Sequence, residues 1–161
     1  MTYSAFNKAL LLNLIKDLIN KIIYGGTRSF SPAERKLLLA VVGELTSTEG
    51  DLLEKQINAI CLVQRQNKGR LTMAYYRKSV SIEKFPYQEY AHCLAKVTYK
   101  CYGKRMKVSI VLHEGGLQSI EGNVPKALSE IEEILSVQIH PSGFKSAIDA
   151  LDQEEHGTNA W

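Results

Sequence analysis

The sequence has 161 residues, of which 45% are hydrophobic and 23% charged, as in a globular chain long enough to bury one core. Its 11 glycines and 4 prolines are too few for a disordered or fibrous protein. The net charge of +3 is unevenly distributed: residues 1–114 carry 18 Lys and Arg and 9 Asp and Glu, whereas residues 115–161 carry 2 and 8. The two parts could bind polar partners or neutralise each other. We expect a single domain over residues 1–161.

Residues 1–24 are predicted to form an amphipathic helix, because Leu11, Ile15, Leu18 and Ile22 recur at helical spacing. Lysines, asparagines and an aspartate interrupt the apolar run, which argues against a membrane span or a signal peptide. We expect this helix to pack on the core, with a membrane surface or a partner as the alternative. Its apolar face is wider than packing on one sheet requires, so a homodimer through this helix is possible.

Residues 31–58 are predicted to be helical. Ser31, Pro32 and Glu34 form a capping box, in which serine caps the helix, proline takes its first position and glutamate bonds back to the cap. A loop is expected at residues 46–51, and a short second helix follows it. These residues start and pack helices, and they carry no chemistry of their own.

Residues 59–122 are predicted to form an antiparallel meander, because the apolar period changes from helical to alternating. The expected strands are residues 59–66, 70–78, 91–102, 105–113 and 117–122. Five residues of the third strand are expected to share the core face: Cys93, Ala95, Val97, Tyr99 and Cys101.

Residues 124–152 are predicted to return to helix, interrupted by a short strand at residues 136–140. Four apolar residues fall at helical spacing on one face: Leu128, Ile131, Ile134 and Leu135. A small last helix is expected at residues 144–152. The fold class is therefore predicted as α+β, with N-terminal helices, a central antiparallel sheet of four to six strands and C-terminal helices.

The cysteines Cys61, Cys93 and Cys101 match no metal-binding pattern, because neither a C-x-x-C pair nor zinc-finger spacing with histidine occurs. Free cysteine usually behaves as a small buried hydrophobic side chain in a reducing compartment. We expect reduced thiols in or next to strands and a cytoplasmic protein. No cofactor is expected, since no phosphate-binding glycine loop or nucleophile elbow occurs.

The stretch from His113 to Gly116 raises the question of a reactive site. Glycines supply the positive φ that a tight hairpin needs, so we expect a turn between two strands. A catalytic histidine needs a nucleophile or an orienting acid, and nothing in the sequence links His113 to one. The sequence therefore predicts a hairpin turn, and a protein that is not an enzyme.

A second hypothesis is nucleic-acid binding by residues 64–78. This stretch combines basic side chains, which bind phosphates, with aromatic side chains, which stack on bases. The residues concerned are Arg65, Lys68, Arg70, Tyr75, Tyr76, Arg77 and Lys78. The sequence motif of an RNA-recognition sheet does not occur, so direct nucleic-acid binding is the less favoured interpretation.

Two stretches, SFSPAERKLLLAVVGE with GDLLEKQINAICLVQRQ and VSIVLHEGGLQSIEGNVP, resemble parts of the immunity proteins of bacterial polymorphic and contact-dependent growth inhibition toxin systems. In the first, the matching residues are Ser31, Glu34, Arg35, Leu37, Leu38, Leu53, Gln56, Ile57 and Ala59. In the second, they are Leu117, Ile120 and Glu121. The resemblance covers roughly residues 30–125, and its motifs are structural ones.

The resemblance implies a non-enzymatic protein that binds a cognate toxin domain and blocks its active site. It carries over no catalytic residues. Many such toxins are nucleases with basic clefts, and an acidic patch can occupy such a cleft. The expected toxin-binding residues, chosen from charge alone, are Glu130, Glu133, Asp149, Asp152, Glu154 and Glu155. The alternative is a small regulatory or adaptor domain that binds protein or RNA, and an enzyme with an unrecognised site is the third hypothesis.

Overall fold

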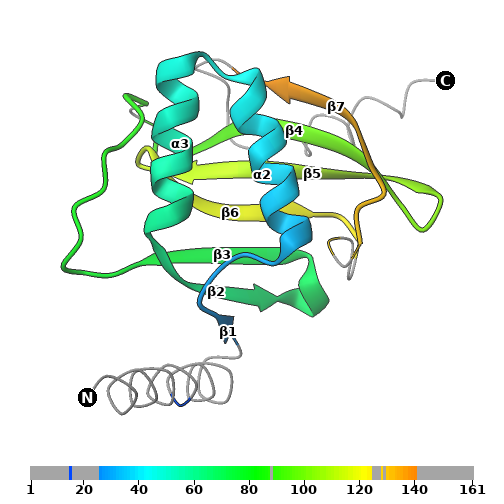
Figure 1. The fold of residues 1–161 in the computed structure, drawn as a ribbon, viewed down its shortest axis with the longest axis horizontal. Coiled ribbons are helices and arrows are strands. Elements are labelled where there is room, and N and C mark those ends of the chain that lie inside the picture. The colour runs from blue at the N-terminus through cyan, green and yellow to red at the C-terminus, as the bar shows by residue number, and fades with distance from the viewer. Residues whose placement is uncertain (1–14, 16–25, 88, 125–127, 129, 141–161) are drawn as a thin grey trace, which may run out of the picture.

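The computed structural model describes residues 15, 26–87, 89–124, 128 and 130–140, and within them the fold is α+β, with two helices and a seven-stranded antiparallel sheet (Figure 1). The helices are α2 (Pro32–Glu44) and α3 (Ser47–Ala59). The strands are β1 (Gly26–Thr27), β2 (Ile60–Gln66), β3 (Leu71–Tyr76), β4 (Ala91–Cys101), β5 (Lys104–His113), β6 (Gly116–Gly122) and β7 (Glu133–Ile139).

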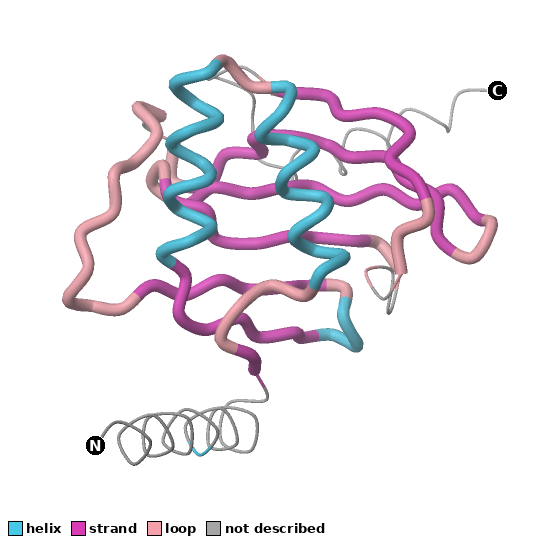
Figure 2. Tube along the Cα trace, in the orientation of Figure 1, coloured by secondary structure: helices cyan, strands magenta, loops and turns pink. Residues whose placement is uncertain are grey.

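The sheet has the order β1-β2-β3-β6-β5-β4-β7, and the two helices lie side by side across one of its faces (Figure 2). The core lies between these two layers, because apolar residues of both helices and of the sheet face each other there. Leu37, Leu38 and Leu53 of the helices are fully buried against Ile110 and Ile120 of the sheet.

The start of α2 confirms the capping box. The Ser31 hydroxyl accepts a hydrogen bond from the Glu34 backbone N–H, and the Glu34 carboxylate accepts one from the Ser31 N–H. Glu34 is also buried and receives Arg65 Nε at 2.8 Å and the Thr72 hydroxyl at 3.0 Å. The capping residue of α2 therefore also ties this helix to strands β2 and β3.

Three tight hairpin turns use residues with positive φ, as the twist of the strands requires. Tyr102 and Gly103 join β4 to β5 with φ of 48° and 70°, and Glu114 and Gly115 join β5 to β6 with φ of 45° and 76°. The predicted turn after His113 is therefore confirmed. The third turn, between β2 and β3, is the short 3-10 segment Asn67–Gly69.

Two local predictions were wrong. Residues 46–51 do not form a loop, because Thr46 caps α3 and accepts a hydrogen bond from the Glu49 N–H. The strict alternation predicted for β4 fails at a β-bulge: Cys93 pairs with Val111, but Ala95 pairs with Ile110. The extra residue in the bulge places Cys93 and Ala95 on opposite faces of the sheet.

The predicted helix at residues 124–135 is also wrong over its described C-terminal part, because Glu133–Ile139 form strand β7 on the edge of β4. Ile134, Val137 and Ile139 pack against the core, whereas Leu135 lies at an irregularity in the ladder and is 39% exposed. A strand forms here because it makes ladder hydrogen bonds with the edge of the buried strand β4. A helix at this position would leave the backbone groups of that edge unpaired. The short strand expected at residues 136–140 is thus present but begins earlier, at Glu133. Because β1 was not expected, the sheet has seven strands rather than four to six.

Two further predictions fall on residues that the structure does not describe. The helix of residues 1–24 lies outside the described residues except for Ile15, which is helical and 45% exposed. The helix expected at residues 144–152 also lies outside them. Among the described residues, no helix is long and apolar enough to cross a membrane. The cysteines Cys61, Cys93 and Cys101 are all free thiols in strands, as predicted.

The buried ion pair of Glu34 predicts a large loss of stability on truncation. Glu34→Ala should lower the free energy of unfolding by about 3 kcal/mol, because it leaves the Arg65 guanidinium without its carboxylate and removes the helix cap. Chemical denaturation monitored by circular dichroism measures this change. Glu83→Ala is the matched control, because its ion pair with Lys55 is exposed and should contribute less than about 1 kcal/mol. Equal losses in the two variants would contradict this account.

Candidate functional site

The side chain of Gln56 joins α3 to two segments that are distant in the sequence. It is 1% exposed, and its Nε2 donates to the backbone carbonyls of Glu83 at 2.7 Å and Gly115 at 3.0 Å. Its Oε1 accepts from the Leu117 backbone N–H at 2.8 Å. A buried amide bonded in this way fixes all three segments, because any displacement leaves polar groups unsatisfied. We call this set of contacts the Gln56 clamp.

The Gln56 clamp explains why strands β3 and β6 pair over only part of their length. Their described pairs run from Leu71 with Glu121 to Met73 with Ser119. Beyond that point both backbone groups of Leu117 bind side chains: the N–H binds Gln56, and the carbonyl accepts the Tyr76 hydroxyl at 2.9 Å. Side chains have therefore taken the place of ladder hydrogen bonds.

A groove of about 340 Å³ lies next to this point. Its lining comes from the end of β3, the segment that follows it and the β5–β6 hairpin: Ala74, Tyr75, Tyr76, Arg77, Lys78, Val80, Ile82, Lys84, His113, Glu114, Gly116, Leu117 and Gln118. We call it the β3–β6 groove. Tyr75 and Val80 are large apolar side chains with exposures of 37% and 43%, so the groove offers apolar surface to solvent.

The basic residues of the β3–β6 groove differ in whether they have an acidic partner. Lys84 pairs with Glu114 at 3.6 Å. The side chains of Arg77 and Lys78 are exposed, and within the described residues neither makes a hydrogen bond or an ion pair. Burial raises the pKa of the Tyr76 phenol above its ordinary value, so this hydroxyl stays protonated and continues to donate to Leu117. The groove therefore combines apolar surface with two free positive charges.

His113 lies at the rim of the groove and has a structural role there. Its ring Nδ1 makes a hydrogen bond with the Tyr90 backbone carbonyl at 2.7 Å, and the two rings meet edge to face with centroids 4.1 Å apart. The Glu114 N–H donates to the same carbonyl at 3.0 Å. Both groups hold the segment before β4 against the hairpin turn.

Two other histidines, His92 and His140, lie where β4 begins and β7 ends. Both are buried, and His92 Nε2 makes a hydrogen bond with the His140 carbonyl at 3.3 Å. Burial lowers the pKa of His140, with Lys96 adding to the effect, so the ring is neutral near pH 7. The His92 ring packs on Tyr87, and burial with the nearby Glu49 carboxylate raises the pKa of Tyr87 to about 12. These contacts pack the start of β4 against Tyr87 and the end of β7.

A second hollow, of about 540 Å³, lies beside the Glu34 ion pair and is lined by Arg65, Lys68, Thr72 and Leu128, among others. Arg65 and Thr72 both donate to the Glu34 carboxylate. These three polar residues of the hollow are therefore engaged in holding α2 to the sheet.

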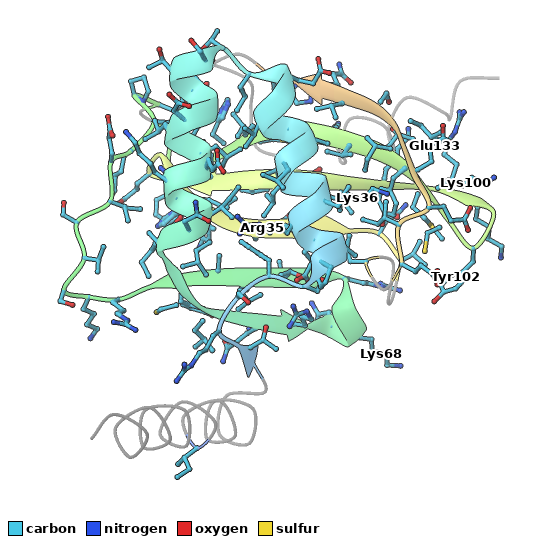
Figure 3. All side chains as sticks on the ribbon, in the orientation of Figure 1. Arg35, Lys36, Lys68, Lys100, Tyr102 and Glu133 are labelled. Atoms are coloured by element: carbon cyan, nitrogen blue, oxygen red, sulfur yellow. The ribbon has the colours of Figure 1, made fainter. Side chains whose placement is uncertain are left out.

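The structure describes only Glu130 and Glu133 of the six acidic residues expected to bind a partner, and both are exposed. Glu133 pairs with Lys100 in the β4–β7 ladder, and the neighbouring Glu132 forms an ion pair with Lys100 at 3.7 Å. Lys36 of α2 donates to the Ile131 and Glu132 carbonyls, and Figure 3 shows Lys36, Lys100 and Glu133 on the same side of the molecule. Basic side chains therefore adjoin this part of the acidic segment. Asp149, Asp152, Glu154 and Glu155 lie outside the described residues.

The residues of the nucleic-acid hypothesis do not form one surface. Arg65 is engaged by Glu34, and Lys68 and Arg70 lie at the β2–β3 turn. Arg77 and Lys78 follow the other end of β3, whose six residues span about 20 Å. Sequence reasoning therefore grouped side chains that the strand separates, and it missed the groove that four of them line: Tyr75, Tyr76, Arg77 and Lys78.

Comparison with known proteins gives no relative for this chain. No protein-family model matches the sequence. No curated protein and no solved structure matches it either.

The packing around Gly115 predicts a position-specific loss of stability. Both Gly115 and Gly103 have positive φ, where alanine costs about 1–2 kcal/mol. A Cβ on Gly115 would also overlap the carbonyl oxygen of Phe85, whereas a Cβ on Gly103 meets no atom within 4 Å. Gly115→Ala should therefore lower the free energy of unfolding clearly more than Gly103→Ala does. Thermal and urea unfolding of both variants measure the difference. Equal losses of stability would show that the β5–β6 hairpin is not held against the segment that contains Phe85.

Proposed function

We propose that this protein is a non-enzymatic immunity protein that binds a bacterial toxin domain and blocks its active site. The observation that carries the proposal is the contact between the two stretches that resemble immunity proteins. Gln56 belongs to the first stretch and Leu117 to the second, and the two residues are hydrogen-bonded in the core. The two stretches are therefore parts of one packed unit, as the resemblance requires.

The surface supports a binding role. Specific interfaces are enriched in tyrosine and arginine, and rigid surfaces bind at a lower entropic cost. The β3–β6 groove presents Tyr75, Val80 and Arg77 on a frame that the Gln56 clamp fixes from below. Tyr90, at 74% exposure, lies next to it through its contact with His113. These side chains form a compact aromatic and basic surface suited to a protein partner.

The acidic segment provides a second contact in this proposal. Glu130 and Glu133 are exposed at the start of β7, and they would meet basic groups in the cleft of a nuclease toxin. Asp149, Asp152, Glu154 and Glu155 extend the same negative charge along the sequence. The nearby Lys100 weakens the negative potential, so the acidic residues would steer association more than they would provide affinity.

The alternative is a regulatory or adaptor domain that binds protein or RNA. Arg77, Lys78 and Tyr75 favour it, because free cations beside an aromatic ring also suit a phosphate and a base. The immunity protein and the adaptor domain would bind different partners, so a functional assay distinguishes the two proposals.

A growth assay tests the proposed function. The C-terminal domain of the protein encoded immediately upstream of this gene should be induced in cells with and without the proposed immunity protein. We expect growth arrest that the protein relieves completely, because a blocked active site cannot act on its substrate. Arrest that the protein fails to relieve, or no arrest, would contradict the immunity proposal and favour the adaptor.

Charge-reversal variants locate the contact within the same assay. Glu130→Lys with Glu133→Lys should reduce the protection against the toxin. Asp51→Lys with Glu54→Lys is the matched control, because it changes the charge equally on exposed positions of α3. Equal protection by both double variants would exclude Glu130 and Glu133 as toxin contacts and would leave the groove as the stronger candidate surface.

A further inference from the structure

The β3–β6 groove holds two positive charges that no described residue neutralises. Arg77 and Lys78 follow β3 directly, and their side chains are exposed without a hydrogen bond or an ion pair in the described part of the chain. The neighbouring Lys84 differs, because Glu114 lies 3.6 Å from it. The two free charges therefore favour an anionic group on whatever occupies the groove.

The groove also offers apolar surface close to these charges. Tyr75 and Val80 are partly exposed, and Ile82 and Leu117 complete the apolar part of the lining. The volume of about 340 Å³ is at the small end of the range for ligand pockets. It therefore suits one or two side chains of a larger partner, one of them apolar.

The number of unpaired cations in the groove distinguishes a peptide ligand from a nucleic-acid ligand. Binding to a nucleic acid gains strength from the number of phosphates that are neutralised along the strand. Here Arg65 is engaged by Glu34, and Lys68 lies about 20 Å away at the other end of β3. Two adjacent cations match one or two carboxylates better than a run of phosphates.

We infer that the β3–β6 groove binds a peptide segment of a protein partner that carries a carboxylate next to a large apolar side chain. The carboxylate contacts Arg77 or Lys78, and the apolar side chain packs on Tyr75 and Val80. The inference rests on the proposed function only to the extent that both require a protein partner. It assigns this contact to the groove, whereas the acidic segment would contact a different part of the toxin.

Selection from a phage-displayed library of random short peptides tests the inference. The wild-type protein should enrich peptides with Asp or Glu beside Phe, Tyr, Trp or Leu. Arg77→Glu with Lys78→Glu should abolish this enrichment. Lys104→Glu with Arg105→Glu is the matched control, because it reverses two exposed charges in the β4–β5 hairpin, and it should retain the enrichment. A basic motif, no shared motif, or the same motif on the groove variant would overturn the inference.

Fluorescence anisotropy with the most enriched peptide measures the strength of the contact. Its affinity should fall about tenfold or more in the Arg77→Glu, Lys78→Glu variant and remain unchanged in the hairpin control. Oligo-deoxythymidine serves as the competing probe at the same salt concentration. Tighter binding of the oligonucleotide than of the peptide, lost in the groove variant, would overturn the inference in favour of a nucleic acid.

The same groove variant distinguishes this inference from the proposed function. A variant that loses the peptide and also loses protection in the growth assay supports both. Peptide selection that succeeds with a wild-type protein that gives no protection supports the groove and contradicts immunity. Full protection by the groove variant supports immunity and contradicts the assignment of the toxin contact to the groove.

Discussion

The side chain of Gln56 holds together three parts of the chain that are far apart in the sequence. Its amide binds the carbonyls of Glu83 and Gly115 and the N–H of Leu117, and it is almost completely buried. Because a buried amide loses much free energy when its partners are absent, α3, the segment after β3 and the β5–β6 hairpin must adopt their positions together. The separation of β3 from β6 beyond their last ladder pair, and hence the β3–β6 groove, follows from this set of hydrogen bonds.

A second buried polar group plays the corresponding role at the other helix. Glu34 caps α2, and the same carboxylate receives Arg65 and Thr72 from β2 and β3. Each helix is therefore fixed to the sheet by one buried polar side chain, as well as by the apolar core between the layers. Apolar packing alone tolerates sliding, whereas directional hydrogen bonds specify one arrangement. A surface built on this frame keeps its shape without a partner, which favours specific recognition.

The sequence predicted the features that depend on neighbouring residues. The capping box at Ser31 and Glu34 and the turn at Glu114 and Gly115 follow from local geometry, and both are present. The helical start and the antiparallel sheet were predicted for the same reason. The segment from Ile131 to Leu135 was mistaken for a helix, because its apolar spacing fits both periods and only the open edge of β4 decides between them. The strand expected at residues 136–140 is present as the larger part of β7.

The groove could not be predicted in the same way. Arg77, Lys78 and Tyr75 were visible in the sequence as a basic and aromatic stretch, but their separation from Lys68 depends on the course of β3. The role of Gln56 depends on the hairpin some sixty residues away, and no spacing rule connects the two. The same holds for the acidic residues, where the proximity of Lys100 to Glu132 arises only when β7 pairs with β4.

Native-state hydrogen exchange at the Leu117 amide tests the central role of the Gln56 clamp most directly. The amide donates to a buried side-chain oxygen, so we predict that it exchanges only through large-scale unfolding, as slowly as the amides of the β4–β5 ladder. Replacement of Gln56 by leucine should make the Leu117 amide exchange much faster. The β4–β5 amides of the same variant should exchange more slowly than the Leu117 amide. Fast exchange of Leu117 in the wild-type protein, or no change in the Gln56→Leu variant, would contradict the account.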